Sequence, residues 1–223
     1  MLFFDIGANR GDATLVALQQ GYDVIAVEPA PRVFEQLIKN FIYNPRVTPL
    51  RYAISDTDYQ LVEFYECVED GLSTLNKDWL TNKTMPYCGK EYRTIKATTI
   101  TLDTLADKFG PPDLIKIDVE GAEWHVLRGM TRKYNTLAME WTFETMAEHE
   151  AQMDYLYALG YRQIALQYIV NHLEQPEDWF LLQENNTNQM LIWHQETSDE
   201  WIESGWQKAG LRPTADVGMM WVR

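Results

Sequence analysis

A glycine-bearing turn at residues 5–11 is the first place in the chain where residue types and spacing could bind a ligand. Gly7 and Gly11 have no Cβ atom, so the backbone can turn tightly there and a ligand can approach it closely. The turn separates a short apolar stretch from a helical pattern, and the first N–H groups of a helix attract a carboxylate or phosphate. The turn therefore predicts a site for an anionic group, although a plain strand-to-helix connection could carry the same glycines.

Glu28 extends this prediction to a nucleoside. It lies 21 residues beyond Gly7, at the end of the next predicted strand, where a carboxylate can accept both hydrogen bonds of a ribose diol. A dinucleotide fingerprint has a glycine where this chain has Asn9, whose Cβ would crowd a pyrophosphate. S-adenosylmethionine (SAM) is favoured over NAD, because its methionine carboxylate and ammonium can meet backbone groups and Asp5.

A second group of carboxylates follows a predicted central strand at residues 114–117. Asp118 and Glu120 come directly after this strand, and Glu140 ends the next one. Open α/β sheets bind ligands at the carboxyl ends of their strands, and buried carboxylates are costly unless paired, hydrated or used. The alternative without chemistry is a helix-capping Asp118 and a solvated Glu123.

Short apolar stretches alternate with helical patterns along most of the chain. This alternation predicts an α/β protein with a parallel sheet covered by helices on both faces. Residues 57–100 depart from the pattern and are predicted to form an antiparallel hairpin or flap with a polar loop. The predicted strands are residues 2–6, 24–27, 50–54, 114–117, 137–140, 161–168 and 189–193.

The charge balance excludes some partners. The chain has 19 basic and 33 acidic residues and a formal net charge of −14. Nucleic acids and anionic membranes are bound through Lys and Arg, so neither partner is expected. No apolar run approaches the roughly 18 residues of a membrane span, and the basic start of a signal peptide is missing. Cys67 and Cys88 are expected to be reduced thiols of a cytoplasmic protein.

Several stretches together resemble one known family, the FkbM-type SAM-dependent methyltransferases. The stretch Lys-Ile-Asp-Val-Glu-Gly-Ala-Glu is highly specific, and the resemblance covers about residues 2–195. It implies the Rossmann-like methyltransferase fold, a seven-stranded, mostly parallel sheet with helices on both faces and an antiparallel last strand. The stretches that carry the resemblance are residues 5–11, 27–29, 53–56, 71–75, 101–105 and 116–123.

The chain is predicted to form one domain, of which the resemblance covers about residues 2–195. Residues 1–223 form a single methyltransferase domain, with 57–100 as an insertion, 189–193 as the closing strand and 196–223 as a C-terminal extension. The chain further resembles the methyltransferase domain of a multidomain viral glycan-building enzyme. That likeness implies further domains of a longer polypeptide and a location in the host cytoplasm.

For the site, the resemblance implies two groups of cofactor contacts. Glu28 would bind the ribose hydroxyls of SAM, Ser55 or Asp56 would lie near the adenine, and Asp118 would lie near the sulfonium. The residues expected around the methionine end of SAM are Asp5, Gly7, Asn9 and Gly11.

Methyl transfer is an in-line displacement, in which the acceptor oxygen and the methyl group must be held about 3–3.5 Å apart. The family mostly methylates hydroxyls of sugars and secondary metabolites, so the expected acceptor is a sugar hydroxyl of a glycan. A hydroxyl must lose its proton, and Asp118 is the first candidate base, Glu140 the second and His149 a further one. Asp118 and Glu140 could instead hold a divalent metal, Mg²⁺ or Mn²⁺.

Aromatic residues are numerous, and their ring faces can stack on sugars. Trp79, Tyr87 and Trp141 are predicted to lie at the acceptor cleft. The acidic chain favours a neutral sugar over a phosphorylated one. Two alternatives stay open: methylation of a hydroxyl or amine of a non-sugar small molecule, and a SAM-binding domain without turnover.

Overall fold

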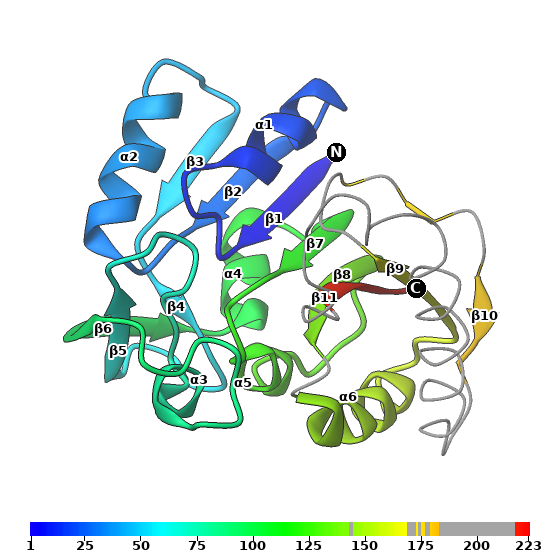
Figure 1. Cartoon of the computed structure of the whole chain (residues 1–223). Helices are drawn as coiled ribbons and strands as arrows, with labels where there is room; N and C mark the ends of the chain where they lie inside the picture. Colours follow the sequence, from blue (N-terminus) through cyan, green and yellow to red (C-terminus); the bar gives the residue numbers. More distant parts are fainter. Residues whose placement is uncertain (143–144, 169–172, 174, 177–178, 183–216) are drawn as a thin grey trace, which may run out of the picture.

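The computed structural model describes residues 1–142, 145–168, 173, 175–176, 179–182 and 217–223. Its main sheet has eight strands in the order β10-β9-β11-β8-β7-β1-β2-β3 (Figure 1). The pairs from β8 to β3 are parallel, whereas β11 is antiparallel to both of its neighbours. The strands are β1 (Leu2–Ile6), β2 (Asp23–Val27), β3 (Val47–Leu50), β7 (Leu114–Ile117), β8 (Thr136–Thr142), β9 (Gln163–Tyr168), β10 (Phe180–Leu181) and β11 (Val217–Val222).

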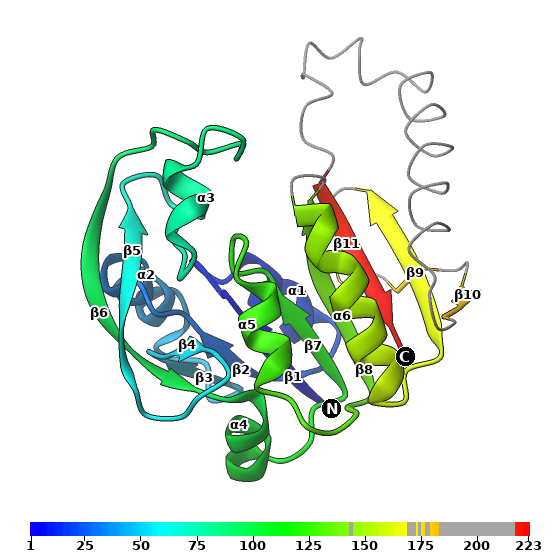
Figure 2. The ribbon, with the colours of Figure 1, turned by 90° about the horizontal axis from the view of Figure 1, so that it is seen from below.

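Helices cover both faces of this sheet, as predicted; in Figure 2, α5 and α6 lie in front of it and α1 and α2 behind. Successive side chains of a strand point to opposite faces. Phe4 of β1 therefore joins a core with Leu105 of α4 and Leu127 of α5, whereas Phe3 joins another with Leu37 of α2. The helices are α1 (Asp12–Gln19), α2 (Pro31–Phe41), α4 (Leu102–Phe109), α5 (Glu123–Arg128) and α6 (Met146–Ala158).

Among the described residues, an antiparallel strand near the end of the chain is β11; the strand expected at residues 189–193 is not tested. β11 lies between β8 and β9 and pairs Met219 with Glu140 and Trp221 with Ala138. Residues 189–193 lie outside the described residues. The end of the expected C-terminal extension is thus a strand of the sheet, because the apolar residues of β11 are buried between two neighbours.

Residues 57–100, predicted to be an insertion, supply two strands of a second, three-stranded sheet in the order β4-β6-β5. β5 (Leu61–Cys67) and β6 (Tyr92–Ile100) are antiparallel, and α3 (Lys77–Thr81) lies in the connection between them (Figure 2). β4 (Ala53–Ile54) pairs with β6, so the strand expected over residues 50–54 is divided between the two sheets. Cys67 and Cys88 are free thiols. Among the described residues, no helix has the length and apolar character of a membrane span.

Candidate active site

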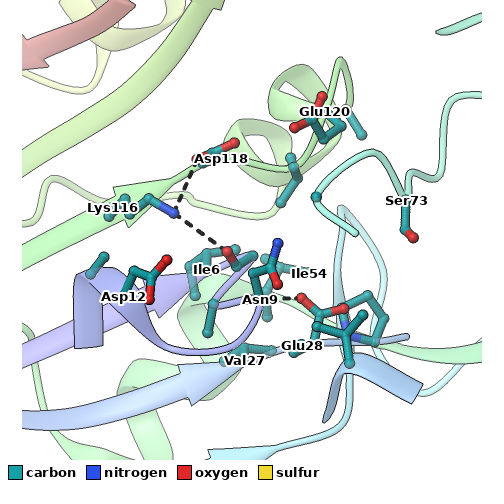
Figure 3. A pocket seen from close by; sticks show the side chains of 18 of the residues that line it. Ile6, Asn9, Asp12, Val27, Glu28, Ile54, Ser73, Lys116, Asp118 and Glu120 are labelled. Carbon is teal, nitrogen blue, oxygen red and sulfur yellow. Dashed lines mark hydrogen bonds and ion pairs between the residues drawn. The ribbon is translucent and has the colours of Figure 1, made fainter. Parts of the chain in front are cut away.

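A cavity of about 650 Å³ lies at the carboxyl ends of β1, β2 and β7 (Figure 3). Its volume is in the range of small-molecule sites, about 300–1,000 Å³. The β1–α1 turn and the end of β2 form one part of its wall, and the turn after β7 forms another. The polar residues that line it and are used below are Asn9, Arg10, Glu28, Asp70, Lys116, Asp118 and Glu120.

The two glycines of the β1–α1 turn make room for protein atoms. Gly7 has a φ of 76°, and a Cβ there would lie 1.8 Å from the backbone oxygen of Asp118. A Cβ on Gly11 would lie 2.2 Å from Cε2 of Phe41. Gly7 still lines the cavity, whereas Gly11 is outside its described lining. A Cβ at either position would therefore collide with a neighbouring element, and the cofactor contacts expected for Gly7 and Gly11 stay predictions.

Glu28 is held in place at the end of β2 by the backbone. Its Oε1 accepts from the N–H of Ala30 at 2.8 Å, and its Oε2 accepts from the N–H of Asn9 at 3.0 Å. Burial raises the pKa of Glu28 to about 7, against the lowering effect of these two hydrogen bonds. Each carboxylate oxygen has a second lone pair, so Glu28 can also accept from a ligand hydroxyl in the cavity.

The residues expected near the adenine lie just outside the cavity. Ser55 is buried, and Asp56 forms an ion pair with Arg128, with 2.8 Å between Oδ2 and Nη2. Neither residue belongs to the described lining. The preceding segment of the chain lines the cavity instead, through Tyr52, Ala53 and Ile54.

Asp5 and Lys116 form a buried ion pair beneath the cavity. Asp5 is 0% exposed; its Oδ2 accepts from Thr14 Oγ1 at 2.6 Å, and its Oδ1 lies 3.6 Å from Lys116 Nζ. Lys116 Nζ also lies 3.1 Å from Asp118 Oδ2. Burial disfavours the ammonium charge, but Asp118 and Asp5 outweigh it and raise the pKa of Lys116.

The contact between Asp5 and the methionine end of SAM stays a prediction. Lys116 lines the cavity, whereas Asp5 is not among the described residues that do so. The observed contact of Asp5 on the cavity side is its ion pair with Lys116. Our sequence reasoning missed Lys116, although a lysine inside an apolar strand was a signal of a buried partner.

Three carboxylates meet beside the cavity: Asp118, Glu120 and Glu140. Lys116 is paired with Ala138 across β7 and β8, so Glu140 lies two residues beyond Ala138 on the face that Lys116 occupies. One carboxylate oxygen from each of the three lies within 4.8 Å of the other two. Glu140 is outside the described lining of the cavity, but Asp118 and Glu120 are part of it.

Burial and mutual repulsion keep two of these carboxyls from ionising. The pKa of Glu120 rises to about 9, through burial and the charge of Asp118. The pKa of Glu140 is raised well above its usual range by burial, Asp118 and Glu120. Glu120 has a φ of 57°, and its Oε2 accepts from Trp79 Nε1 at 3.1 Å. The sequence predicted that Asp118 and Glu140 belong to neighbouring strands, which the structure confirms, but β8 continues to Thr142, so Glu140 does not end its strand.

The ring of His149 is held by hydrogen bonds within α6 and to the end of β8. It is buried on α6, with Nδ1 2.8 Å from Gln152 Oε1 and Nε2 3.1 Å from the backbone oxygen of Thr142. Burial lowers the pKa of His149. The described part of the cavity lining does not include it, so the structure does not bring His149 together with Asp118 and Glu140.

The aromatic residues expected at an acceptor cleft are mostly covered. Trp79 and Trp141 are 0% and 2% exposed, so neither presents a ring face to a sugar. Tyr87 is half-buried, with its ring centroid 5.6 Å from that of Trp79. The observed contribution of Trp79 is its hydrogen bond to Glu120.

The inserted segment supplies part of the cavity wall. Asp70 forms ion pairs with Arg10 of the β1–α1 turn and with Arg32 of α2. Residues from Asp70 to Leu75 therefore stay beside Asn9 and Glu28. Nothing in the local sequence indicated this pairing, since its partners are about 40–60 residues apart.

The fold and the site together define the class of protein. An acidic residue at the end of β2 beside the β1–α1 turn is the arrangement that binds a nucleoside. The sheet adds the antiparallel strand that methyltransferases insert next to the last parallel strands. The chain belongs to the FkbM methyltransferase family, because the model of the methyltransferase FkbM domain matches residues 5–163. The family is SAM-dependent.

Individual relatives are similar to this chain to different degrees. The hexuronic acid methyltransferase AglP of Haloferax volcanii is 31% identical over 133 residues, which are 58% of this chain and 50% of the relative. The chain thus spans about half the length of this curated relative. A precorrin 8W decarboxylase from Methanobacterium thermoautotrophicum has a TM-score of 0.46 at 12% identity, covering 100% of this chain and 81% of that one. A precorrin-6y C5,15-methyltransferase from Geobacter metallireducens has a TM-score of 0.42 at 9% identity, covering 100% of this chain and 80% of that one.

Proposed function

We propose that the chain transfers the methyl group of SAM to a sugar hydroxyl of a glycan. The observation that carries this proposal is the position of Asp118, which lines the same cavity as Glu28 and lies within reach of Glu140. A nucleoside-binding carboxylate and a candidate base thus share one cavity. Membership of the FkbM family and the similarity to a hexuronic acid methyltransferase support a sugar acceptor.

The residues of the cavity fit SAM. Glu28 is fixed by two backbone N–H groups and faces a cavity large enough for a nucleoside. The β1–α1 turn precedes the N-terminus of α1, whose free N–H groups favour the methionine carboxylate. When bound, SAM supplies a methyl group activated by its positively charged sulfur.

The acceptor hydroxyl must lose its proton during the reaction. Asp118 is the best-placed group to accept it, because it lines the cavity and Lys116 restrains its Oδ2 at 3.1 Å. Glu140 is less suited to this role, since burial and the neighbouring carboxylates raise its pKa well above the usual range and it lies outside the described lining of the cavity. In this proposal Asp118 is the general base, and Lys116 is a positioning residue that holds its carboxylate in place.

The proposal is tested by incubating the protein with SAM and a panel of acceptors. A neutral oligosaccharide should gain about 14 Da, the mass of one CH₂ group left by a transferred methyl. Phosphorylated sugars should react poorly, because the carboxylates beside the cavity repel them. Methylation confined to non-sugar hydroxyls or amines would overturn the acceptor class. Binding of S-adenosylhomocysteine without any methyl transfer would indicate a domain without turnover.

The raised pKa of Glu28 predicts pH-dependent nucleoside binding. Its carboxyl is largely protonated below pH 7 and ionises as the pH rises through its pKa of about 7, and a carboxylate accepts hydroxyl hydrogen bonds more strongly than a neutral carboxyl. The affinity for 5′-methylthioadenosine should therefore rise about tenfold between about pH 6 and pH 8.5. Isothermal titration calorimetry measures this, because the probe carries the ribose diol and no group that titrates in this range.

The Glu28→Gln variant is the comparison for this prediction. It should bind the probe at least about tenfold more weakly at pH 8.5, the loss expected for one charged hydrogen bond, and its affinity should not change with pH. Glu35→Gln, at an exposed position of α2, is the matched control and should behave as wild type. If Glu28→Gln bound the probe with the same affinity and the same pH dependence as wild type, Glu28 would be excluded as the ribose ligand.

A further inference from the structure

The carboxylate group formed by Asp118, Glu120 and Glu140 has the dimensions of a cation site. One oxygen from each residue lies within 4.8 Å of the other two. Hard divalent cations bind oxygens at about 2.0–2.6 Å, so two ligands of one ion lie at most roughly 4–5 Å apart. The three residues come from the turn after β7 and from β8, so two adjacent strands of the main sheet hold them together.

Glu140 provides an independent sign of a missing partner. It is only 8% exposed, and its Oε2 has no hydrogen-bond partner within the described part of the chain. A buried carboxylate oxygen without a partner costs free energy, because it loses its hydration and gains nothing in exchange. This oxygen belongs to the residue that closes the three-carboxylate group, so a ligand bound there would give it a partner.

The charges around the group also favour a cation. In the described structure Lys116 forms an ion pair with Asp118, one of the three carboxylates, and this ammonium group is shared with Asp5. Glu120 and Glu140 form no ion pair with a Lys or Arg side chain in the described part of the chain. A divalent ion bound by the three residues would supply two positive charges to this group of acids.

The surroundings orient the ligands. Trp79 Nε1 donates to Glu120 Oε2 at 3.1 Å, and Lys116 Nζ contacts Asp118 Oδ2. Glu120 and Asp118 therefore each have one carboxylate oxygen fixed by the protein and a second oxygen that can bind an ion. Such outer contacts are typical of metal sites, where they hold the ligands in position.

We propose that Asp118, Glu120 and Glu140 bind one divalent cation that prefers oxygen ligands, Mn²⁺ or Mg²⁺. This inference rests on the proposed function for its purpose: a cation beside the base would lower the pKa of an acceptor hydroxyl. The binding itself needs neither SAM nor an acceptor. It can therefore be tested separately from methyl transfer.

The test is a titration of the chelator-treated full chain with Mn²⁺, in the absence of SAM and acceptor. Electron paramagnetic resonance measures the free ion. The expected result is one tightly bound equivalent in the wild-type protein. The affinity should fall at least about tenfold in Glu140→Gln and in Glu120→Gln. Glu150→Gln, an exposed position of α6 with the same change of charge, should bind as wild type.

A thermal-unfolding measurement makes the test independent of folding defects. Without metal, Glu140→Gln should be at least as stable as wild type, because it removes a repelled carboxyl. Mn²⁺ should then raise the Tm of the wild-type protein more than that of the variant, since a bound ion stabilises the native state. No binding to the wild-type protein at about 1 mM Mn²⁺, the weak end for such sites, would overturn the proposal. Equal affinity in wild type and Glu140→Gln would do the same.

Discussion

Lys116→Met should unfold at much lower denaturant concentration than wild type, with a loss of about 3–5 kcal/mol. Asp5 is 0% exposed, and Lys116 Nζ is the ammonium group 3.6 Å from its Oδ1. Methionine fills a similar volume but leaves the carboxylate of Asp5 buried without a cation. Removing one member of a buried pair is costly, because the remaining charge keeps its desolvation penalty and loses its attraction. Urea unfolding followed by circular dichroism measures the loss.

Two further variants make this result specific. Lys96→Met removes an exposed ion pair with Glu63, at 3.6 Å, and should cost less than about 1 kcal/mol. Asp5→Asn in the Lys116→Met background should recover part of the stability, because it removes the uncompensated charge. If Lys116→Met were no less stable than Lys96→Met, the buried pair would not hold the site together.

The second large effect is a loss of methyl-transfer turnover, which we expect for the Asp118→Asn variant. The variant keeps the size of the side chain but removes the group proposed to accept the proton. General-base catalysis contributes about 10²- to 10⁴-fold, so kcat at saturating SAM should fall by that factor. The measurement is transfer of labelled methyl to the oligosaccharide that reacts best with the wild-type protein.

Asp113→Asn is the matched control for Asp118→Asn. Asp113 precedes β7 at the opposite end of the same strand, and its carboxylate accepts from the N–H of Leu2 at 2.7 Å. It should retain full turnover, because asparagine keeps an acceptor oxygen there. Wild-type turnover in Asp118→Asn, combined with a large loss in Glu140→Gln, would transfer the role of base to Glu140. Wild-type turnover in both variants would remove the carboxylates from the mechanism.

Local sequence was sufficient for the features that depend on neighbours in the chain. Alternating apolar stretches and helical patterns indicated a parallel sheet with helices on both faces, and the structure has this arrangement. The order of Gly7, Glu28 and Asp118 at successive strand ends placed one cavity at the carboxyl edge of the sheet. This works because parallel strands all end at the same edge.

Features that depend on contacts between distant segments needed the tertiary structure. Periodicity could not show that β11 inserts between β8 and β9, because an apolar stretch pairs equally well with several others. The pattern around His149 gave no sign that its ring is buried against Gln152 and Thr142. Likewise, the local sequence did not show that Asp56 forms an ion pair with Arg128, which lies 72 residues further along the chain.

The sequence by itself determined the family, the sheet edge at which chemistry takes place, and the acids Glu28 and Asp118 at strand ends. Only the tertiary structure decided that Asp5 forms a buried ion pair with Lys116, and that Glu120 lies close to Asp118 and Glu140. The physical reason is the strand register. Pairing sets which side chains share a face, and burial on that face then determines which charges must find partners.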